Sequence, residues 1–270
     1  MLVALLERLP ILVVGIVFCG GAVALTTLAQ VSLHRRWSIE ARRPLNEVAG
    51  FIIAVVGVVY AVLLASIAIL AIERYDKAED IVETEAGVAG DIYRDAIGMP
   101  QPVRDEIRAA ITDYMTTVVE IEWDLMAREV PVERGWQSHG WRDLGELLGS
   151  VAAFEPATQG QVVFLQELLT QINALNDARR SRMFLAHNPI DAVIWWVVIA
   201  GGFSTVTLAL LFGVPNAPGH LLVSNLLAFS IALVLLLIFV MDRPFSGASR
   251  VTAEPFHYVQ ERIAALDGGG

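Results

Sequence analysis

The stretch NEVAGFIIAVVGVVYAVLLASIAILAIERY, residues 46–75, decides the fold class of this chain. Between Glu47 and Glu73 it holds 25 consecutive residues without a charged side chain. A helix rises about 1.5 Å per residue and the hydrocarbon core of a bilayer is about 30 Å thick, so this segment is long enough to cross a membrane. We therefore predict a transmembrane helix over residues 48–72.

One face of this predicted helix carries only small residues. Spacings of three and four place the following residues on that face: Gly50, Ala54, Gly57, Ala61, Ala65 and Ala68. Small residues let membrane helices approach closely, so packing within one subunit is the first interpretation. The second is a face that borders a conduit, with these small side chains as pore-lining candidates.

Two polar residues accompany this face. Asn46 lies four residues before Gly50, at the predicted membrane boundary, where it can line a pore mouth or cap the helix. We favour the cap. Tyr60 lies at mid-span beside the small residues, and a buried hydroxyl there needs an acceptor. We expect a hydrogen bond between helices, with a role as a pore-lining gate as the alternative.

The composition is that of an integral membrane protein. Mean hydropathy is +0.57, 55% of the residues are hydrophobic and 18% are charged. Further uncharged segments predict spans over residues 10–33, 191–213 and 219–241. The sequence thus predicts an all-α membrane protein in a 2+2 arrangement, with hairpins in residues 1–72 and 189–241 around a soluble insert, and a tail over 242–270.

The insert, residues 73–188, is acidic and has helical periodicity. It holds 21 acidic and 11 basic residues, which argues against nucleic acid as a partner. The helix of the second span is expected to continue into it without a break. A further helix is predicted over residues 102–129, with Ile121 on its apolar side.

Basic residues bear on orientation. Arg35, Arg36, Arg42 and Arg43 lie in the short loop between the first two spans, and eight basic residues flank the spans on the other side. By the positive-inside rule we favour a cytoplasmic soluble domain and an inner-membrane location. The four loop arginines suit anions, whereas the acidic insert would attract cations.

Charged clusters are predicted close to the membrane ends of the insert. Arg179, Arg180 and Arg182 precede the third span, and Glu83 and Glu85 follow the second. Ion pairs between the clusters are one expectation. Recruitment of anions or lipid headgroups by the arginines is the other.

A turn is predicted directly after the fourth span. Asp242 ends the apolar run as an interfacial anchor, and the proline and glycine of the segment up to Gly247 would press Phe245 toward the membrane. These three residues are candidates for a structural or gating role, as are Glu85, Arg179 and Arg182.

The sequence offers no enzyme motif. The five histidines have no metal-ligand spacing, and phosphate-binding loops and nucleophile elbows are absent. No charged residue lies inside a predicted span, which argues against a proton-coupled transporter. We expect neither enzymatic activity nor a metal or cofactor.

Several segments together resemble the bestrophin-like membrane protein family. They are residues 46–50 and 57–64, Glu85-Ala86 and Tyr93, Asp177, Arg179, Arg182, Pro189 and Trp195, and finally Asp242, Pro244, Phe245, Gly247 and Val251. The resemblance covers nearly the whole chain, and its motifs are short and apolar. The second span departs from bestrophins in offering small residues where they present bulkier ones.

The resemblance implies a distant likeness to bestrophins, which are pentameric ion channels that mostly pass anions through a neck lined by the second membrane helix. It implies a homo-oligomeric channel in contact with lipid and inorganic ions, with Asn46, Gly50, Ala54, Gly57, Tyr60 and Ala61 lining the pore. The alternative function is a non-conducting membrane sensor or scaffold whose acidic domain binds a partner.

Overall fold

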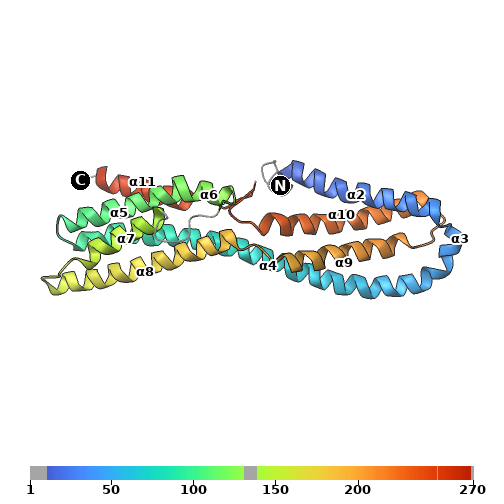
Figure 1. Cartoon of the computed structure of the whole chain (residues 1–270), viewed down its shortest axis with the longest axis horizontal. Helices are drawn as coiled ribbons and strands as arrows, with labels where there is room; N and C mark the ends of the chain where they lie inside the picture. The colour runs from blue at the N-terminus through green and yellow to red at the C-terminus, as the bar shows by residue number, and fades with distance from the viewer. Residues whose placement is uncertain (1–10, 131–138, 248, 269–270) are drawn as a thin grey trace. The chain divides into compact units, whose positions relative to one another are not determined.

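The computed structural model describes residues 11–130, 139–247 and 249–268, and helices are the only regular elements in these ranges. The all-α fold class is confirmed (Figure 1). The elements, in order, are α2 (Ile11–Arg36), α3 (Ile39–Arg42), η1 (Arg43–Leu45), α4 (Asn46–Asp95), η2 (Ala96–Gly98), α5 (Val103–Thr117), η3 (Val118–Glu122), α6 (Trp123–Ala127), α7 (His139–Ala152), α8 (Gln159–His187), α9 (Ala192–Leu210), α10 (Ala217–Met241) and α11 (Glu254–Gly268).

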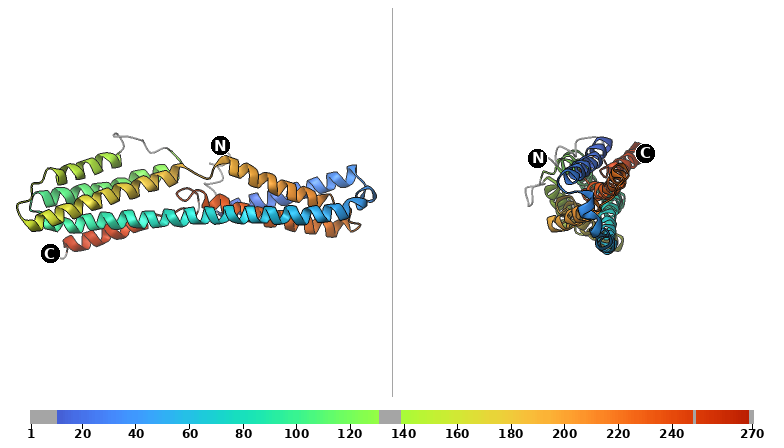
Figure 2. Two further views of the ribbon diagram at one scale, coloured as in Figure 1. Left: turned by 90° about the horizontal axis from the view of Figure 1, so that it is seen from below. Right: turned by 90° about the vertical axis from the view of Figure 1, so that its right-hand side faces the viewer.

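Four helices are long and apolar enough to cross a membrane, as predicted. They are α2, the N-terminal half of α4, α9 and α10. Helix α4 has 50 residues and continues without a break beyond the predicted span, which confirms that expectation (Figure 2). Its buried positions recur at helical spacing along its whole length, from Ala49 and Tyr60 to Ala86 and Tyr93.

The chain divides into two compact units, which we call the membrane unit and the soluble unit. The membrane unit comprises residues 1–74, 190–243 and 247–249, and the soluble unit comprises 75–189, 244–246 and 250–270. Residues 250–268 therefore pack within the soluble unit, and Phe256 of α11 is fully buried there.

The membrane unit is centred on close packing of α2 against α10. Thr27 and Asn225 exchange hydrogen bonds across this contact, at 3.3 and 3.0 Å, and Phe18 stacks on Phe239 with ring centroids 6.4 Å apart. Polar side chains inside such a bundle pair with each other because lipid offers no partners.

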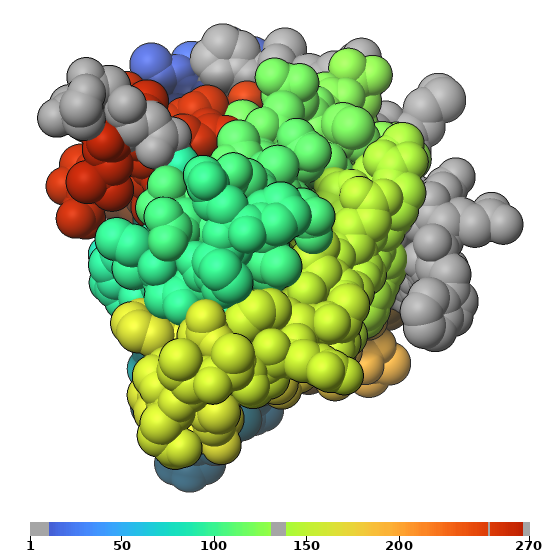
Figure 3. All heavy atoms as spheres, turned by 90° about the vertical axis from the view of Figure 1, so that its left-hand side faces the viewer, coloured from blue at the N-terminus to red at the C-terminus, as the bar shows by residue number. Residues whose placement is uncertain are grey.

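The soluble unit is a helical bundle around the C-terminal half of α4. Helices α5, α8 and α11 lie alongside α4, and α7 packs on α5 and α8 (Figures 1 and 2). Its core includes Ala78, Ile92, Ile111 and Leu175, all fully buried. The side chains of α5, α7 and α8 meet over the end of the unit shown in Figure 3.

A π-helical turn changes the register of the helix predicted over residues 102–129. The chain passes from α5 through the π turn η3 into α6. This turn fits one extra residue into the helix, so the side chains after it rotate around the axis. Ile121, predicted on the apolar side, is 38% exposed, whereas Glu122 and Trp123 are buried.

Candidate functional site

The span of α4 buries one face against its own subunit and leaves the small-residue face largely uncovered. Tyr60, Leu64 and Ile67 are buried, but Ala54 and Ala61 on the neighbouring face are exposed. Among the described residues, packing within one subunit therefore covers this face only in part, since Gly50, Gly57 and Ala68 are half-buried.

The individual glycines on this face differ slightly. A Cβ atom built on Gly57 would meet no heavy atom within 4 Å among the described residues, and one on Gly50 would meet only the Phe212 ring, at 4.0 Å. The small-residue face of α4 is free for a neighbouring molecule or a conduit.

Tyr60 instead packs into a close contact with α9. A Cβ atom on Gly201 would lie 2.6 Å from Cδ2 of the Tyr60 ring, and one on Gly202 would lie 2.8 Å from its hydroxyl. The expected hydrogen bond between helices is wrong, because the buried hydroxyl has no partner among the described residues. Two consecutive glycines provide the room that the ring needs.

Gly201→Ala is expected to destabilise the membrane unit by about 1–3 kcal/mol, because the added methyl group overpacks the contact with Tyr60. Thermal unfolding of the full chain in detergent measures the loss. Gly20→Ala in α2 is the matched control, since its Cβ atom would meet nothing within 4 Å among the described residues. Equal stability of the two variants would refute the close contact.

Asn46 binds the turn that follows α9 and does not cap its own helix. Its Oδ1 accepts a hydrogen bond from the N–H of Gly213 at 2.8 Å, and its Nδ2 donates to the carbonyl of the same residue at 3.4 Å. The expectation of a cap is wrong, because η1 runs directly into α4 and the side chain is used in this tertiary contact. Arg42, fully buried, donates to the carbonyls of Leu210 and Phe212 beside it.

Asp242 ties the ends of the last two spans together. Its Oδ1 accepts from the backbone N–H of Ile190 at 2.6 Å, and its Oδ2 accepts from Nε1 of Trp195 at 3.3 Å. The carboxylate is almost fully buried. It therefore fixes the start of α9 against the end of α10, which goes beyond the interfacial anchor expected from the sequence.

The soluble unit contains a buried network of two arginines and two glutamates. Arg182 on α8 donates from Nε to Oε2 of Glu85 at 2.6 Å and from Nη2 to Oε2 of Glu122 at 2.7 Å. Arg179, one turn earlier, donates from Nε to Oε1 of Glu122 at 3.2 Å. Ion pairing between the two charged clusters was predicted, and the pair that forms is Arg182 with Glu85. Glu83 is exposed, and Arg180 pairs at the surface with Asp177.

The network is balanced in charge and closely enclosed. The hydroxyl of Tyr114 on α5 donates a hydrogen bond to Oε1 of Glu85. All four ionic side chains are at most 4% exposed. A Cβ atom on Gly140 would overlap Oε1 of Glu122 and the guanidinium of Arg179, so a larger residue there would displace the network. Because Arg179 and Arg182 are enclosed and paired with carboxylates, neither is available to lipid headgroups.

Aromatic rings cover one side of this network. The Arg182 guanidinium lies 5.5 Å from the Trp123 ring centroid, and Phe245 and Phe256 meet the same ring edge-on at 5.9 and 6.1 Å. Phe245 thus belongs to the core of the soluble unit, contrary to the expectation that it presses toward the membrane. Gly247 has φ of +80°, which only glycine adopts without strain.

The charges around Glu122 lower its pKa. Burial alone would raise the pKa of this carboxyl, but the charges of Arg182 and Arg179 and their hydrogen bonds outweigh burial and hold it below its ordinary value. A lowered pKa in the folded state contributes stability above the unfolded value of about 4.3, and that stability is lost as pH falls through the folded value.

Glu122→Gln is therefore expected to lower the unfolding midpoint at neutral pH, with the difference from wild type shrinking below about pH 4.3. At low pH the protonated carboxyl becomes equivalent to the amide. Thermal unfolding of the full chain across this pH range measures the difference. Glu120→Gln, an exposed site two residues earlier, should show no difference at any pH. A gap for Glu122→Gln that does not depend on pH would contradict the lowered pKa.

Comparison with known proteins gives the family. A family model described as a bestrophin-like domain matches residues 20–256. The chain belongs to the bestrophin-like family. No curated protein matches the chain by sequence.

Solved structures share this bestrophin-like fold. A variant of a bacterial bestrophin homologue from Klebsiella pneumoniae is 14% identical, with a TM-score of 0.71 over 93% of this chain and 99% of that one. Another structure of that homologue is 12% identical, with a TM-score of 0.69 over 92% and 97%. A variant described as a membrane protein is 12% identical, with a TM-score of 0.72 over 93% and 98%. At these identities the likeness concerns the fold.

The sequence did not reveal that Glu122, Tyr114 and Trp123 belong to this buried network. A carboxylate within an otherwise apolar helix face was the available signal for Glu122, but the π turn hid its register. Among the described residues, no three histidine, cysteine, aspartate or glutamate side chains lie close enough together to hold a metal ion.

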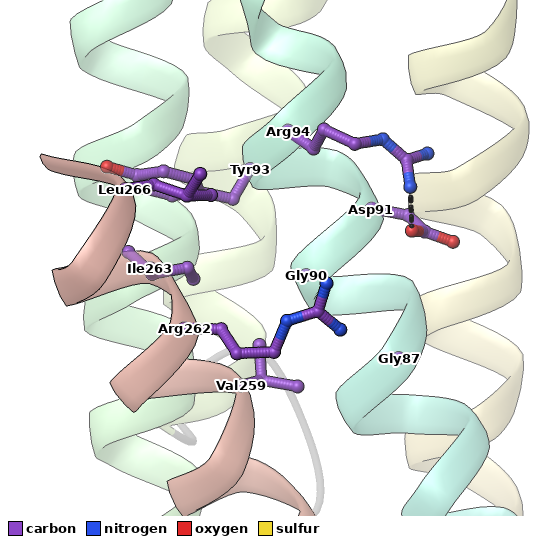
Figure 4. Close-up of a pocket in the computed structure, with 9 residues that line it drawn as sticks. All are labelled: Gly87, Gly90, Asp91, Tyr93, Arg94, Val259, Arg262, Ile263 and Leu266. Carbon is purple, nitrogen blue, oxygen red and sulfur yellow. Dashed lines mark hydrogen bonds and ion pairs between the residues drawn. The ribbon is translucent and has the colours of Figure 1, made fainter. Parts of the chain in front are cut away.

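An open groove separates α4 from α11 in the soluble unit. Arg262 extends from α11 toward α4, where Gly87 and Gly90 leave room for it (Figure 4). Arg94 and Asp91 of α4 also line the groove. They form an ion pair at 2.7 Å on the side of α4 that faces away from α11. The lining is mostly apolar and offers no catalytic constellation.

Proposed function

We propose that this chain forms a homo-oligomeric ion channel in the membrane, with the small-residue face of α4 lining the conduit. The observation that carries the proposal is an uncharged spanning helix whose face at Ala54, Gly57 and Ala61 is left uncovered by its own subunit. Membership of the bestrophin-like family supports it, since bestrophins are oligomeric channels lined by their second membrane helix.

Symmetry connects the uncovered face to a pore. In a ring of identical subunits, each chain presents the same face toward the axis. Small residues on that face leave space along the axis, whereas the bulky exposed residues of α4, such as Phe51 and Val58, suit contacts with lipid. The proposed pore lining is thus Gly50, Ala54, Gly57 and Ala61, since Asn46 and Tyr60 contact α9 and its following turn.

We propose anions as the conducted ions. Arg35 and Arg36 at the end of α2 and Arg43 at the start of η1 are exposed and can concentrate anions at that end of the membrane unit. Arg42 was predicted to lie with them in the same short loop, but it is buried and does not contribute to this surface. The soluble unit is proposed to lie in the cytoplasm, below the inner membrane.

Planar-bilayer recording of the purified protein tests the function. We expect unitary currents whose reversal potential follows the chloride gradient. A reversal potential that follows the cation gradient would refute the anion assignment alone. Absence of unitary currents in several salts would refute the channel.

The alternative is a non-conducting sensor or scaffold, favoured by the acidic surface of the soluble unit and the open groove between α4 and α11. Native mass spectrometry in detergent distinguishes the two functions. A ring of four or more subunits supports a conduit, whereas a monomer or simple dimer supports the scaffold.

A further inference from the structure

Four polar side chains gather at the end of the membrane unit where α2 and α9 end and α10 begins. They are Gln30 and His34 on α2, Arg42 on α3 and His220 on α10. Gln30 and His34 are one turn apart, and the rings of His34 and His220 lie 6.0 Å apart between centroids. His220 contacts the carbonyl of Ala209 at 3.0 Å, and Arg42 donates to the carbonyl of the next residue, Leu210, at 3.0 Å.

Each of these side chains has buried polar atoms without a partner among the described residues. Both amide atoms of Gln30 are unpaired, as are Nε and Nη2 of Arg42, Nε2 of His34 and Nδ1 of His220. Gln30 is 2% exposed, Arg42 is 0% exposed and His220 is 6% exposed. Buried polar groups in proteins are nearly always hydrogen-bonded, so four such side chains in one place indicate a missing occupant.

The charge of Arg42 decides what the occupant is. Its guanidinium contacts two backbone carbonyls, and no carboxylate of the described chain forms an ion pair with it. A buried charge without a counter-charge is destabilising, and a bound counter-ion would offset that destabilisation. Because the Arg42 side chain is 0% exposed, a small ion inside the cluster suits it better than a bulky lipid headgroup.

We propose that this cluster binds a halide-sized inorganic anion between Arg42, Gln30 and the two histidines. Nε and Nη2 of Arg42 and Nε2 of Gln30 provide N–H donors. Each histidine uses one ring nitrogen on a carbonyl, His34 on that of Gln30 and His220 on that of Ala209. Its other nitrogen has no partner among the described residues. The site is distinct from the α4 face proposed as the pore lining, and it does not depend on ion conduction.

Bromide provides the direct test, because its anomalous scattering distinguishes it from water. In crystals grown in saturating sodium bromide, we expect an anomalous peak within hydrogen-bond reach of Nε and Nη2 of Arg42. Water alone at this position in saturating bromide would overturn the proposal.

Thermal unfolding in detergent provides the second test. Sodium chloride is compared with sodium gluconate at equal ionic strength, because gluconate is too large for an enclosed site. At about 100-fold excess over Kd, chloride should raise Tm by roughly 5 °C. Gln30→Leu and Arg42→Met should lose this shift. Thr27→Val should keep it, since Thr27 pairs with Asn225 elsewhere on the same helix contact.

Two outcomes of the second test would overturn the proposal. One is an equal Tm of the wild type in both salts. The other is a chloride shift that persists in Gln30→Leu, because binding would then occur elsewhere. Gln30→Leu keeps the test decisive if Arg42→Met fails to fold.

Discussion

Arg182→Met is expected to lower the free energy of unfolding of the soluble unit by about 3–5 kcal/mol, because it removes one partner of a buried ion pair. Arg182 is fully buried and contacts Glu85, Glu122 and the sulfur of Met126. Its removal leaves three ionic groups with only Arg179 as a cation, so one buried carboxylate loses its counter-charge. Thermal unfolding of the full chain in detergent should show a fall in midpoint of roughly 10 °C.

Arg180→Met is the matched control for this change. Arg180 lies two residues earlier on α8, and its pair with Asp177 is about 70% exposed on both sides. Exposed pairs of this kind contribute about 0–1 kcal/mol, so its midpoint should barely move. In the double variant Glu85→Met with Arg182→Met, part of the lost stability should return, because both buried charges are removed together. Equal midpoints for the two single variants would refute a structural role of the network.

Gly57→Leu is expected to abolish ion flux or disrupt oligomer assembly without unfolding the subunit. A Cβ atom at Gly57 would meet no described heavy atom of its own chain within 4 Å, so we attribute the expected effect to a neighbouring subunit or the conduit. Planar-bilayer recording and native mass spectrometry measure the two effects separately.

Val58→Leu is the control on the same helix turn. Val58 is 66% exposed and belongs to the bulky surface of α4, where one more methylene group fits against lipid. We expect wild-type assembly and currents in this variant. Wild-type assembly and flux in Gly57→Leu itself would contradict the assignment of the small-residue face to a contact or a pore.

Membrane spans were predictable from the sequence because their constraint is local. Every backbone group in lipid must be paired within the helix, and the helix must be long enough to cross, so apolar length alone identifies it. The continuation of α4 beyond the membrane was also predictable, because its apolar positions keep helical spacing from Ala49 to Tyr93.

Side-chain partners were predictable only in part. Pairing between the two charged clusters was predictable from their places in the sequence, but the structure decided that Arg182 pairs with Glu85. Glu122 was one of 21 acidic residues in the insert, and its place within an apolar helix face was a weak local signal whose register only the π turn η3 settles. Asn46 and Tyr60 were assigned local or helix-to-helix hydrogen bonds, but distant glycines on or after α9 determine their contacts.

The sequence by itself determined an all-α membrane protein with two pairs of spans around an acidic helical insert, because length, charge and periodicity act within each segment. Only the tertiary structure decided which face of α4 is left uncovered and which carboxylates neutralise Arg179 and Arg182. It also decided that Arg42 is buried without a counter-charge. These features depend on the rotation and meeting of helices far apart in the chain, and small changes in register move a side chain from the surface to the core.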